Sequence, residues 1–113
     1  MGKPEAYVED YLRKQCKQNS FLIYKFVSPG YRGVPDDMII AHGRVVFVEC
    51  KAEHGRVSDI QKAVIKQMRE SGADVRVFNS REQVDELIKE LKGSSGELIT
   101  REMHNTPTGC SGG

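Results

Sequence analysis

Residues 33–51 constrain the fold more than any other stretch, because they read as two short strands joined by a tight turn at residues 42–43. Side chains alternate between the two faces of a strand, so Glu49 and Lys51 should project from the same face of the second strand. Antiparallel pairing about the turn would bring Asp36 opposite Glu49. Two carboxylates and an ammonium would then meet at one end of a sheet. Such a cluster of charges is energetically costly unless the carboxylates bind a divalent cation.

The segments around this hairpin predict alternating helices and strands. The sequence favours further helices at residues 4–18, 58–71 and 80–92 and further strands at residues 21–27 and 75–78. The apolar run at residues 45–48 predicts a central strand that is covered on both faces. The strand, helix and strand between residues 45 and 78 predict a right-handed parallel crossover. The expected fold is therefore α/β, in the order α-β-β-β-α-β-α, with a mixed sheet packed between helices.

A chain of 113 residues has room for one domain with one modest core. The helical pattern stops at Gly93, so we expect a single domain over residues 1–93 and a flexible C-terminal tail over residues 94–113. We find no signal peptide and no apolar run of membrane-spanning length, so no membrane partner is expected. The three cysteines are widely separated, which argues against a zinc knuckle or a disulfide framework and indicates a reducing cytoplasm.

Two polar residues lie at the apolar stripes of predicted helices. Glu9 is close in angle to Leu12 and Cys16, either as a solvated flank residue or as a carboxylate that leans over the sheet toward the charged cluster. Gln61 lies within the apolar stripe of the next helix. The members of that stripe, all expected to be buried, are Ile60, Val64, Ile65 and Met68. The Gln61 amide either reaches the backbone in its own first turn or points into a cleft beyond the charged strand end.

The formal net charge of +1 does not by itself indicate a nucleic-acid partner, so any basic surface must come from local arrangement. Lys62, Lys66 and Arg69 share one face of the helix that contains Gln61. Such a basic stripe is either solvated or flanks the acidic cluster, where a phosphate backbone would need it.

The charged cluster has the composition of a hard-cation site, because such cations prefer carboxylate, carbonyl and water oxygens. Asp36 and Glu49 supply carboxylates, and the backbone carbonyl of Cys50 lies on the same edge although its thiol faces away. Lys51 could orient or help deprotonate a metal-activated water and stabilise charge on an attacked phosphate, and Gln61 could hold the same water. These groups suit the hydrolysis of a phosphodiester with Mg²⁺, or with Mn²⁺ as a substitute, and no organic cofactor is expected.

At these residues the sequence resembles the PD-(D/E)XK nuclease superfamily and, more narrowly, the small stand-alone phage and prophage form of the virus-type replication-repair nuclease (VRR-NUC) family. The resemblance covers roughly residues 5–91 and is carried by Glu9, residues 25–30, residues 32–36, residues 45–51 and Gln61. It implies a restriction-endonuclease-like fold with Asp36 and Glu49 as metal ligands and Lys51 as the catalytic lysine. Gln61 and Glu9 would be supporting active-site residues.

One position departs from that resemblance. Family members commonly carry Arg or Lys after the motif aspartate, where this chain has Asp37. The missing positive charge puts in doubt any substrate contact from that position. Strand alternation should turn Asp37 to the face opposite Asp36, so metal binding should be unaffected.

The resemblance implies a metal-dependent, structure-selective DNA endonuclease that acts on branched DNA such as four-way junctions, in a bacterial or phage-infected cell. The expected DNA contacts are Arg32, Lys62, Lys66 and Arg69. Symmetric cutting of two strands would need a two-fold homodimer. The main alternative is a catalytically inactive nucleic-acid-binding module of the same fold.

Two further alternatives are disfavoured by the pattern. A cysteine enzyme that uses Cys50 and His54 would need an accessible thiol, but that thiol should face the packed side of the sheet. A purely structural protein would leave the cluster of Asp36, Glu49 and Lys51 without a purpose.

Overall fold

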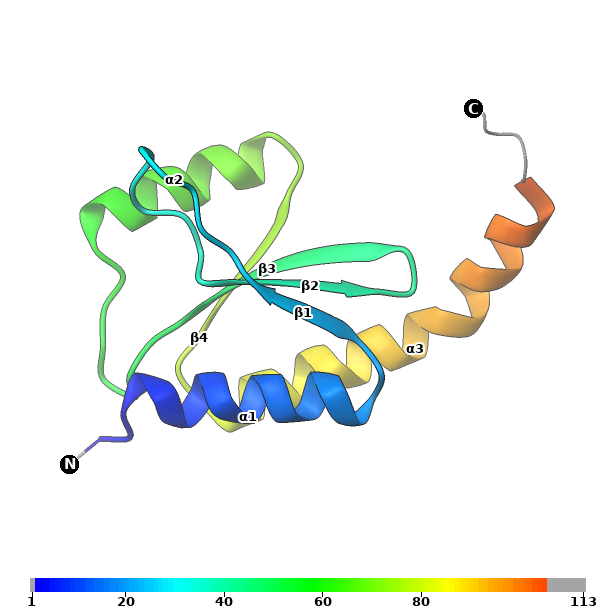
Figure 1. Cartoon of the computed structure of the whole chain (residues 1–113), viewed down its shortest axis with the longest axis horizontal. Helices are drawn as coiled ribbons and strands as arrows, with labels where there is room; N and C mark the ends of the chain where they lie inside the picture. Colours follow the sequence, from blue (N-terminus) through cyan, green and yellow to red (C-terminus); the bar gives the residue numbers. More distant parts are fainter. Residues whose placement is uncertain (1, 106–113) are drawn as a thin grey trace.

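The computed structural model describes the backbone of residues 2–105 and the side chains of residues 2–93. Its elements are α1 (Glu5–Gln18), β1 (Leu22–Lys25), β2 (Asp37–Ala41), β3 (Arg44–Cys50), α2 (Asp59–Glu70), β4 (Asp74–Phe78) and α3 (Arg81–Asn105). The predicted order of helices and strands is confirmed (Figure 1). None of the helices in the described part of the chain has the length and apolar character that a membrane span requires.

The four strands form one mixed sheet in the order β1-β2-β3-β4. The first three strands pair antiparallel, and β4 pairs parallel to β3, as the predicted crossover requires. The β2–β3 turn has φ of 50° at His42 and 80° at Gly43, the positive values of the tight hairpin turns that match strand twist. Asp37 pairs with Val48, so the register continued by one residue sets Asp36 opposite Glu49, as predicted.

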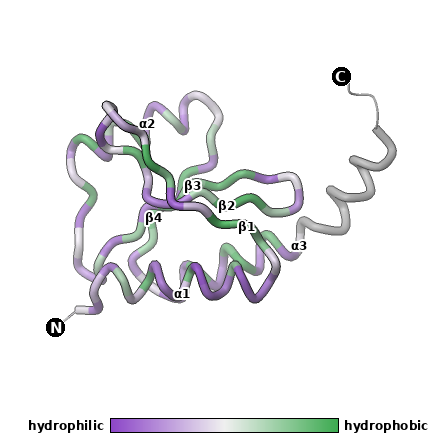
Figure 2. The backbone as a smooth tube through the Cα atoms, in the orientation of Figure 1, coloured by the Kyte–Doolittle hydropathy of each residue, from purple (hydrophilic) through white to green (hydrophobic). Residues whose placement is uncertain are grey.

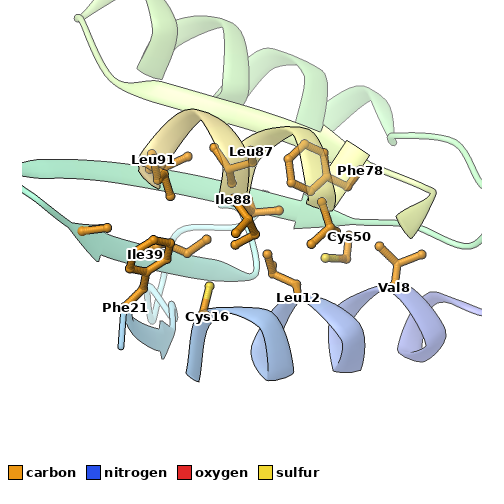
Figure 3. Packing of buried hydrophobic residues seen from close by; sticks show 14 residues of the cluster. Val8, Leu12, Cys16, Phe21, Ile39, Cys50, Phe78, Leu87, Ile88 and Leu91 are labelled. Carbon is orange, nitrogen blue, oxygen red and sulfur yellow. The ribbon is translucent and has the colours of Figure 1, made fainter. Parts of the chain in front are cut away.

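Helices α1 and α3 cover one face of the sheet, and the main core lies between them and the strands (Figure 3). The stripe predicted on the first helix contributes Val8, Leu12 and Cys16, which are all fully buried. Cys50 faces the same core from the end of β3. Since its neighbours Glu49 and Lys51 therefore face away from α1, the charged strand end opens on the other side of the sheet.

Helix α2 packs on that other side, mainly over the edge strand β4. Val64 and Ile65 of α2 are buried, whereas Ile60 is 44% exposed and Val45 on β3 is 46% exposed. The predictions that Ile60 is buried and that residues 45–48 are covered on both faces are therefore wrong at these two side chains. The twelve-residue helix lies to one side, and the β2–β3 hairpin extends past it (Figure 1).

Helix α3 continues to Asn105, whereas the sequence predicted an end at Gly93. Gly93 is not among the glycines with positive φ, so it lies inside the helix and does not form a C-terminal cap. An interior glycine costs only about 1 kcal/mol relative to alanine, and the first proline after Arg81 is Pro107. Residues 106–113 of the expected tail lie outside the described residues.

Candidate active site

Four of the residues predicted for the site converge at the adjoining ends of β2 and β3. The Lys51 Nζ atom lies 3.0 Å from Glu49 Oε2, and Gln61 Nε2 donates a hydrogen bond of 2.8 Å to the same oxygen. Glu49 is only 1% exposed, and Asp36 lies across from it by strand register. The hairpin and the first turn of α2 thus place two carboxylates, an ammonium and an amide around one point.

The side-chain amide of Gln61 makes two hydrogen bonds, one through its oxygen and one through its nitrogen. Its Oε1 accepts a hydrogen bond of 3.0 Å from the Ser58 backbone N–H, and its own N–H donates to Ser58 Oγ, which completes a capping box. Its Nε2 remains available for Glu49. Both interpretations of the Gln61 amide, as a first-turn backbone partner and as a group that points into the site, are therefore correct together.

Two buried carboxylate oxygens in the site have no hydrogen-bond partner among the described residues, Asp36 Oδ2 and Glu49 Oε1. A buried oxygen without a donor is costly, and burial raises the pKa of Glu49 against the opposing hydrogen bonds from Lys51 and Gln61. Lys51 and Gln61 hold one oxygen of Glu49 and leave the other unpaired. Unpaired, oriented carboxylate oxygens are the ligands that Mg²⁺ and Mn²⁺ take, so the residues present fit a divalent cation.

The protein would supply only part of such a coordination shell. Among residues 2–93, no three His, Cys, Asp or Glu side chains are grouped so that they could hold a metal ion by themselves. Magnesium commonly binds through one or two carboxylates and keeps several waters. Solvent and a backbone carbonyl would therefore complete the coordination shell that Asp36 and Glu49 begin. The predicted carbonyl is that of Cys50.

The structure places Glu9 in a different cluster and brings Glu5 toward the site instead. Glu9 pairs with Lys25 at 2.8 Å, on the α1 side of the sheet. Burial raises the pKa of Glu5, and so does the negative charge of Asp36, while Lys51 opposes the shift. The Glu5 carboxyl therefore lies within electrostatic reach of the charged strand end. Glu5 and Glu9 share a helix face one turn apart, and that spacing is the signal in the sequence that could have found Glu5.

Asp37 faces away from Asp36, as strand alternation predicts, but it is fully buried and bonded. Arg13 Nη2 donates to Asp37 Oδ1 at 2.7 Å, and Asp37 Oδ2 has no partner among the described residues. Burial raises the pKa of Asp37 to about 7, reinforced by the nearby Glu9 carboxyl and opposed by Arg13 and Lys25. This partly buried ion pair was not anticipated from the sequence.

A cleft of about 350 Å³ opens beside the charged cluster. Its lining residues are Arg32, Gly33, Val34, Lys51, Ser58, Ile60 and Gln61. The structure thus brings the predicted DNA contact Arg32 together with Lys51 and Gln61. A polyanion that entered this cleft would meet two cationic side chains.

The predicted basic stripe on α2 lies elsewhere. Lys62, Lys66 and Arg69 line a groove between α2 and β4 rather than the cleft. Arg69 donates to the Val75 carbonyl at 2.7 Å and Lys66 pairs with Glu70 at 3.0 Å, so two of the three basic groups already have partners. A DNA contact by this stripe remains a prediction.

The thiol of Cys50 is excluded from the cleft by its position in the core. Its side chain is fully buried, and burial raises the pKa of the thiol far above its ordinary value. A thiolate nucleophile needs a lowered pKa and access to substrate. The orientation predicted for Cys50 is confirmed, and it argues against a cysteine enzyme.

Gly33 holds the loop of residues 26–34 against α2, and a side chain there should disturb the cleft. Its φ is +90°, and a Cβ atom would lie 2.7 Å from Ile60 Cγ2 and 3.0 Å from the Ile60 carbonyl oxygen. We expect Gly33→Ala to lower the free energy of unfolding by about 1–3 kcal/mol and to displace Arg32 from the cleft. Urea unfolding measures the first effect, and salt-dependent DNA binding measures the second.

Gly30→Ala is the matched control for this prediction. Gly30 lies in the same loop with φ of +80°, but a Cβ atom there would meet nothing within 4 Å. In both variants the alanine must adopt a left-handed backbone conformation, which is unfavourable, and only Gly33→Ala adds the clash with α2. Equal losses of stability in the two variants would show that the Gly33 contact does not hold the loop.

Comparison with known proteins identifies the family of this chain. The family model described as the VRR-NUC domain matches residues 5–82. The phage protein named "Putative nuclease p44", from Acyrthosiphon pisum secondary endosymbiont phage 1, is 34% identical over 79 residues, which span 69% of this chain and 85% of that protein. A solved structure described as a VRR_NUC domain superposes with a TM-score of 0.70 at 30% identity, covering 77% of this chain and 96% of that one. This chain therefore belongs to the VRR-NUC nuclease family.

Proposed function

We propose that this VRR-NUC nuclease is a metal-dependent endodeoxyribonuclease that hydrolyses phosphodiesters in branched DNA. The observation that carries the proposal is the pair of buried, unpartnered oxygens on Asp36 and Glu49 beside the ammonium of Lys51. A divalent cation at this point would supply a Lewis acid for the phosphate and for an attacking water. All three side chains of a phosphodiester-cleaving set are present, which favours an enzyme over an inactive module that only binds DNA.

Each side chain of the site would have a separate role in the reaction. Asp36 and Glu49 would hold the cation through the oxygens that the protein leaves unpaired. Lys51 Nζ, fixed 3.0 Å from Glu49, would stabilise negative charge on the phosphate and orient the water. Gln61 would keep Glu49 in place, and Arg32 would hold a neighbouring phosphate in the cleft.

Branched DNA is the proposed substrate because the cleft suits backbone and shape recognition. Arg32 and Lys51 are the cationic side chains in its lining, and cationic contacts to phosphate fix position without reading bases. Selectivity would then come from the shape and deformability of a junction or flap rather than from its sequence.

A cleavage assay tests this proposal. The full chain would be incubated with linear duplex, nicked, flapped and four-way-junction DNA, each with Mg²⁺, with Mn²⁺ and with EDTA. We expect cleavage only with a metal ion, and faster cleavage of branched DNA than of linear duplex. Cleavage in EDTA, or DNA binding without any cleavage, would contradict the proposal, and the second result would favour the inactive binding module.

A homodimer is proposed as the active form, and the uncovered face of the sheet supports it. Two cross-strand rows on this face hold six side chains without charge: Leu22, Ile40 and Val45, then Tyr24, Met38 and Phe47. Leu22, Tyr24 and Val45 are each about half exposed, and the hairpin strands are largely apolar along their length (Figure 2). A polyanion gains little from an uncharged face, whereas a second copy could bury it as the centre of an interface of about 800 Å² per partner.

Such a dimer would separate its two active sites by a distance that strand geometry sets. Asp36 lies four residues along β2 from Ile40, or roughly 14 Å. A two-fold axis near the row of Ile40 and Val45 would place the two sites roughly 25–30 Å apart, at opposite ends of the interface.

Val45→Lys should break this interface. We expect the wild type to sediment as a dimer at micromolar concentration and Val45→Lys to shift to monomer, because a lysine would have to be desolvated in the apolar row. Val27→Lys is the control, since Val27 is 69% exposed and lies outside both rows. A monomeric wild type, or a dimer that Val45→Lys leaves intact, would contradict the proposed interface.

A further inference from the structure

The ion pair between the fully buried Asp37 and the partly exposed Arg13 lies on the opposite side of the sheet from the proposed cation site. Asp37 is 0% exposed, and Arg13 Nη2 donates to its Oδ1 at 2.7 Å. Asp36 and Asp37 are adjacent in the chain but face opposite sides of the sheet, Asp36 toward Glu49 and Asp37 toward α1. The short peptide between them is therefore held by groups on both sides.

The ion pair is part of a small network that ties α1 to β1 and β2. Glu9 and Arg13 lie on successive turns of α1, with 3.6 Å between Arg13 Nη2 and Glu9 Oε2. Glu9 Oε2 is 2.8 Å from Lys25 Nζ, and Lys25 is the residue that pairs with Asp37 across the β1–β2 ladder. The first residue of β2 is thus fixed from the helix and from the neighbouring strand.

The backbone is fixed at the same place. The carbonyl of Asp36 accepts a hydrogen bond of 2.7 Å from the Phe26 N–H, just before β2 begins. Because adjacent side chains in a strand point in opposite directions, any rotation of the strand that frees Asp37 from Arg13 also moves the Asp36 carboxylate relative to Glu49. The Arg13–Asp37 contact therefore restrains one of the motions that would change the spacing of the two candidate ligands.

Stability alone does not explain this partly buried pair. The desolvation of the fully buried Asp37 cancels much of its attraction to Arg13, whose side chain is 32% exposed, and a well-packed apolar pair often serves stability as well or better. What an apolar pair lacks is direction, since hydrogen bonds to a guanidinium fix the rotation of a carboxylate. An ion pair is therefore more useful than an apolar pair where the orientation of the strand has to be fixed.

We infer that Arg13 and Asp37 are positioning residues for the cation site: their ion pair holds the start of β2 so that the Asp36 carboxylate stays in register with Glu49. The inference rests on the proposed role of Asp36 and Glu49 as cation ligands. It also gives a role to Asp37, which the proposed chemistry at Asp36, Glu49 and Lys51 does not use. In this ion pair the guanidinium of Arg13 comes from α1, and the carboxylate of Asp37 comes from β2.

Direct binding of Mn²⁺, followed by electron paramagnetic resonance without DNA, tests the inference. The variants are Arg13→Met, the double variant Arg13→Met/Asp37→Leu, and Asp37→Asn. Arg13→Met leaves a buried carboxylate without its cation, so it should lose stability and weaken the Mn²⁺ affinity about 10-fold or more. The double variant should recover the urea midpoint of the wild type but keep the weakened affinity, because its apolar pair cannot fix the strand rotation. Asp37→Asn keeps an acceptor for Arg13 and should bind Mn²⁺ almost as the wild type does.

Arg76→Met is the control for a merely structural ion pair. Arg76 pairs with Asp74 at 2.6 Å on the same face of the sheet but on β4. It should lower the urea midpoint and leave the Mn²⁺ affinity unchanged. Wild-type Mn²⁺ affinity in the folded double variant would overturn the positioning role while leaving the proposed cation site intact. Failure of the wild type itself to bind Mn²⁺ would instead refute the proposed function.

Discussion

Glu49→Gln is expected to abolish divalent-cation binding and to lower DNA cleavage by more than about 100-fold, without loss of stability. Loss of a residue that merely supports a metal ligand typically costs 10–100-fold, so loss of a ligand should cost more. Glutamine has the size of glutamate and can still accept a hydrogen bond from Lys51, so the packing around position 49 should survive. Mn²⁺ titration calorimetry and kcat/KM on a four-way junction measure the two losses.

The stability of this variant should change in the opposite direction from its activity. Burial raises the pKa of Glu49 above its ordinary 4.5, so the folded protein binds a proton more readily than the unfolded chain. Protonated Glu49 therefore stabilises the folded protein. This contribution is complete below the pKa that Glu49 has in the unfolded chain, and it is lost as the pH rises through the higher pKa that Glu49 has in the folded protein. In EDTA at neutral pH, Glu49→Gln should therefore be at least as stable as the wild type, and the difference should close as the pH falls toward 4.5.

Adding metal should reverse that order. At a Mn²⁺ concentration of 100 times its Kd, the wild type should gain about 2.7 kcal/mol and Glu49→Gln should gain nothing. Glu86→Gln, which changes the same charge on the exposed side of α3, controls for net charge and should keep the metal-dependent gain. A wild type that gains no stability from Mn²⁺, or a Glu49→Gln protein that gains as much, would refute the cation site.

The hairpin could be predicted because the signals for it are local. Alternation assigns Glu49 and Lys51 to one face, and a two-residue turn leaves a single register, so Asp36 had to lie opposite Glu49. The capping box at Ser58 similarly predicted where α2 begins. Each of these signals acts within a few residues, and the contacts elsewhere in the fold did not override them.

Features that depend on how elements pack together could not be predicted in the same way. Glu5 and Glu9 share one helix face, and only the position of α1 along the sheet decides which carboxyl reaches the strand end. Ile60 and Val45 were expected to be buried because their neighbours are apolar, but α2 packs over β4 and leaves both half exposed. The face of Asp37 followed from alternation, whereas its partner Arg13 is 24 residues away in the chain.

Lys51→Met is expected to lower cleavage by about 100- to 1000-fold while Mn²⁺ binding is retained, which separates the role of Lys51 from that of Glu49. Methionine keeps the length of the side chain and removes the ammonium that lies 3.0 Å from Glu49. The loss should appear in kcat, because this charge acts on the phosphate in the transition state more than in the bound substrate. Single-turnover cleavage with saturating enzyme measures that step.

Removal of one partner of a largely buried pair has a structural cost that must be separated from this effect. Lys51 is 17% exposed in its side chain and Glu49 is 2% exposed, so Lys51→Met leaves a buried carboxylate with only Gln61 as a donor. Cleavage should therefore be compared where urea unfolding shows the variant fully folded, with Lys89→Met, which removes an exposed lysine of α3 outside the proposed site, as the control for charge. If folded Lys51→Met cleaves at the wild-type rate, the ammonium only neutralises Glu49 and the chemistry must be carried by other residues. If Mn²⁺ binding is lost together with cleavage, Lys51 acts by holding the ligand, and its proposed action on the phosphate is refuted.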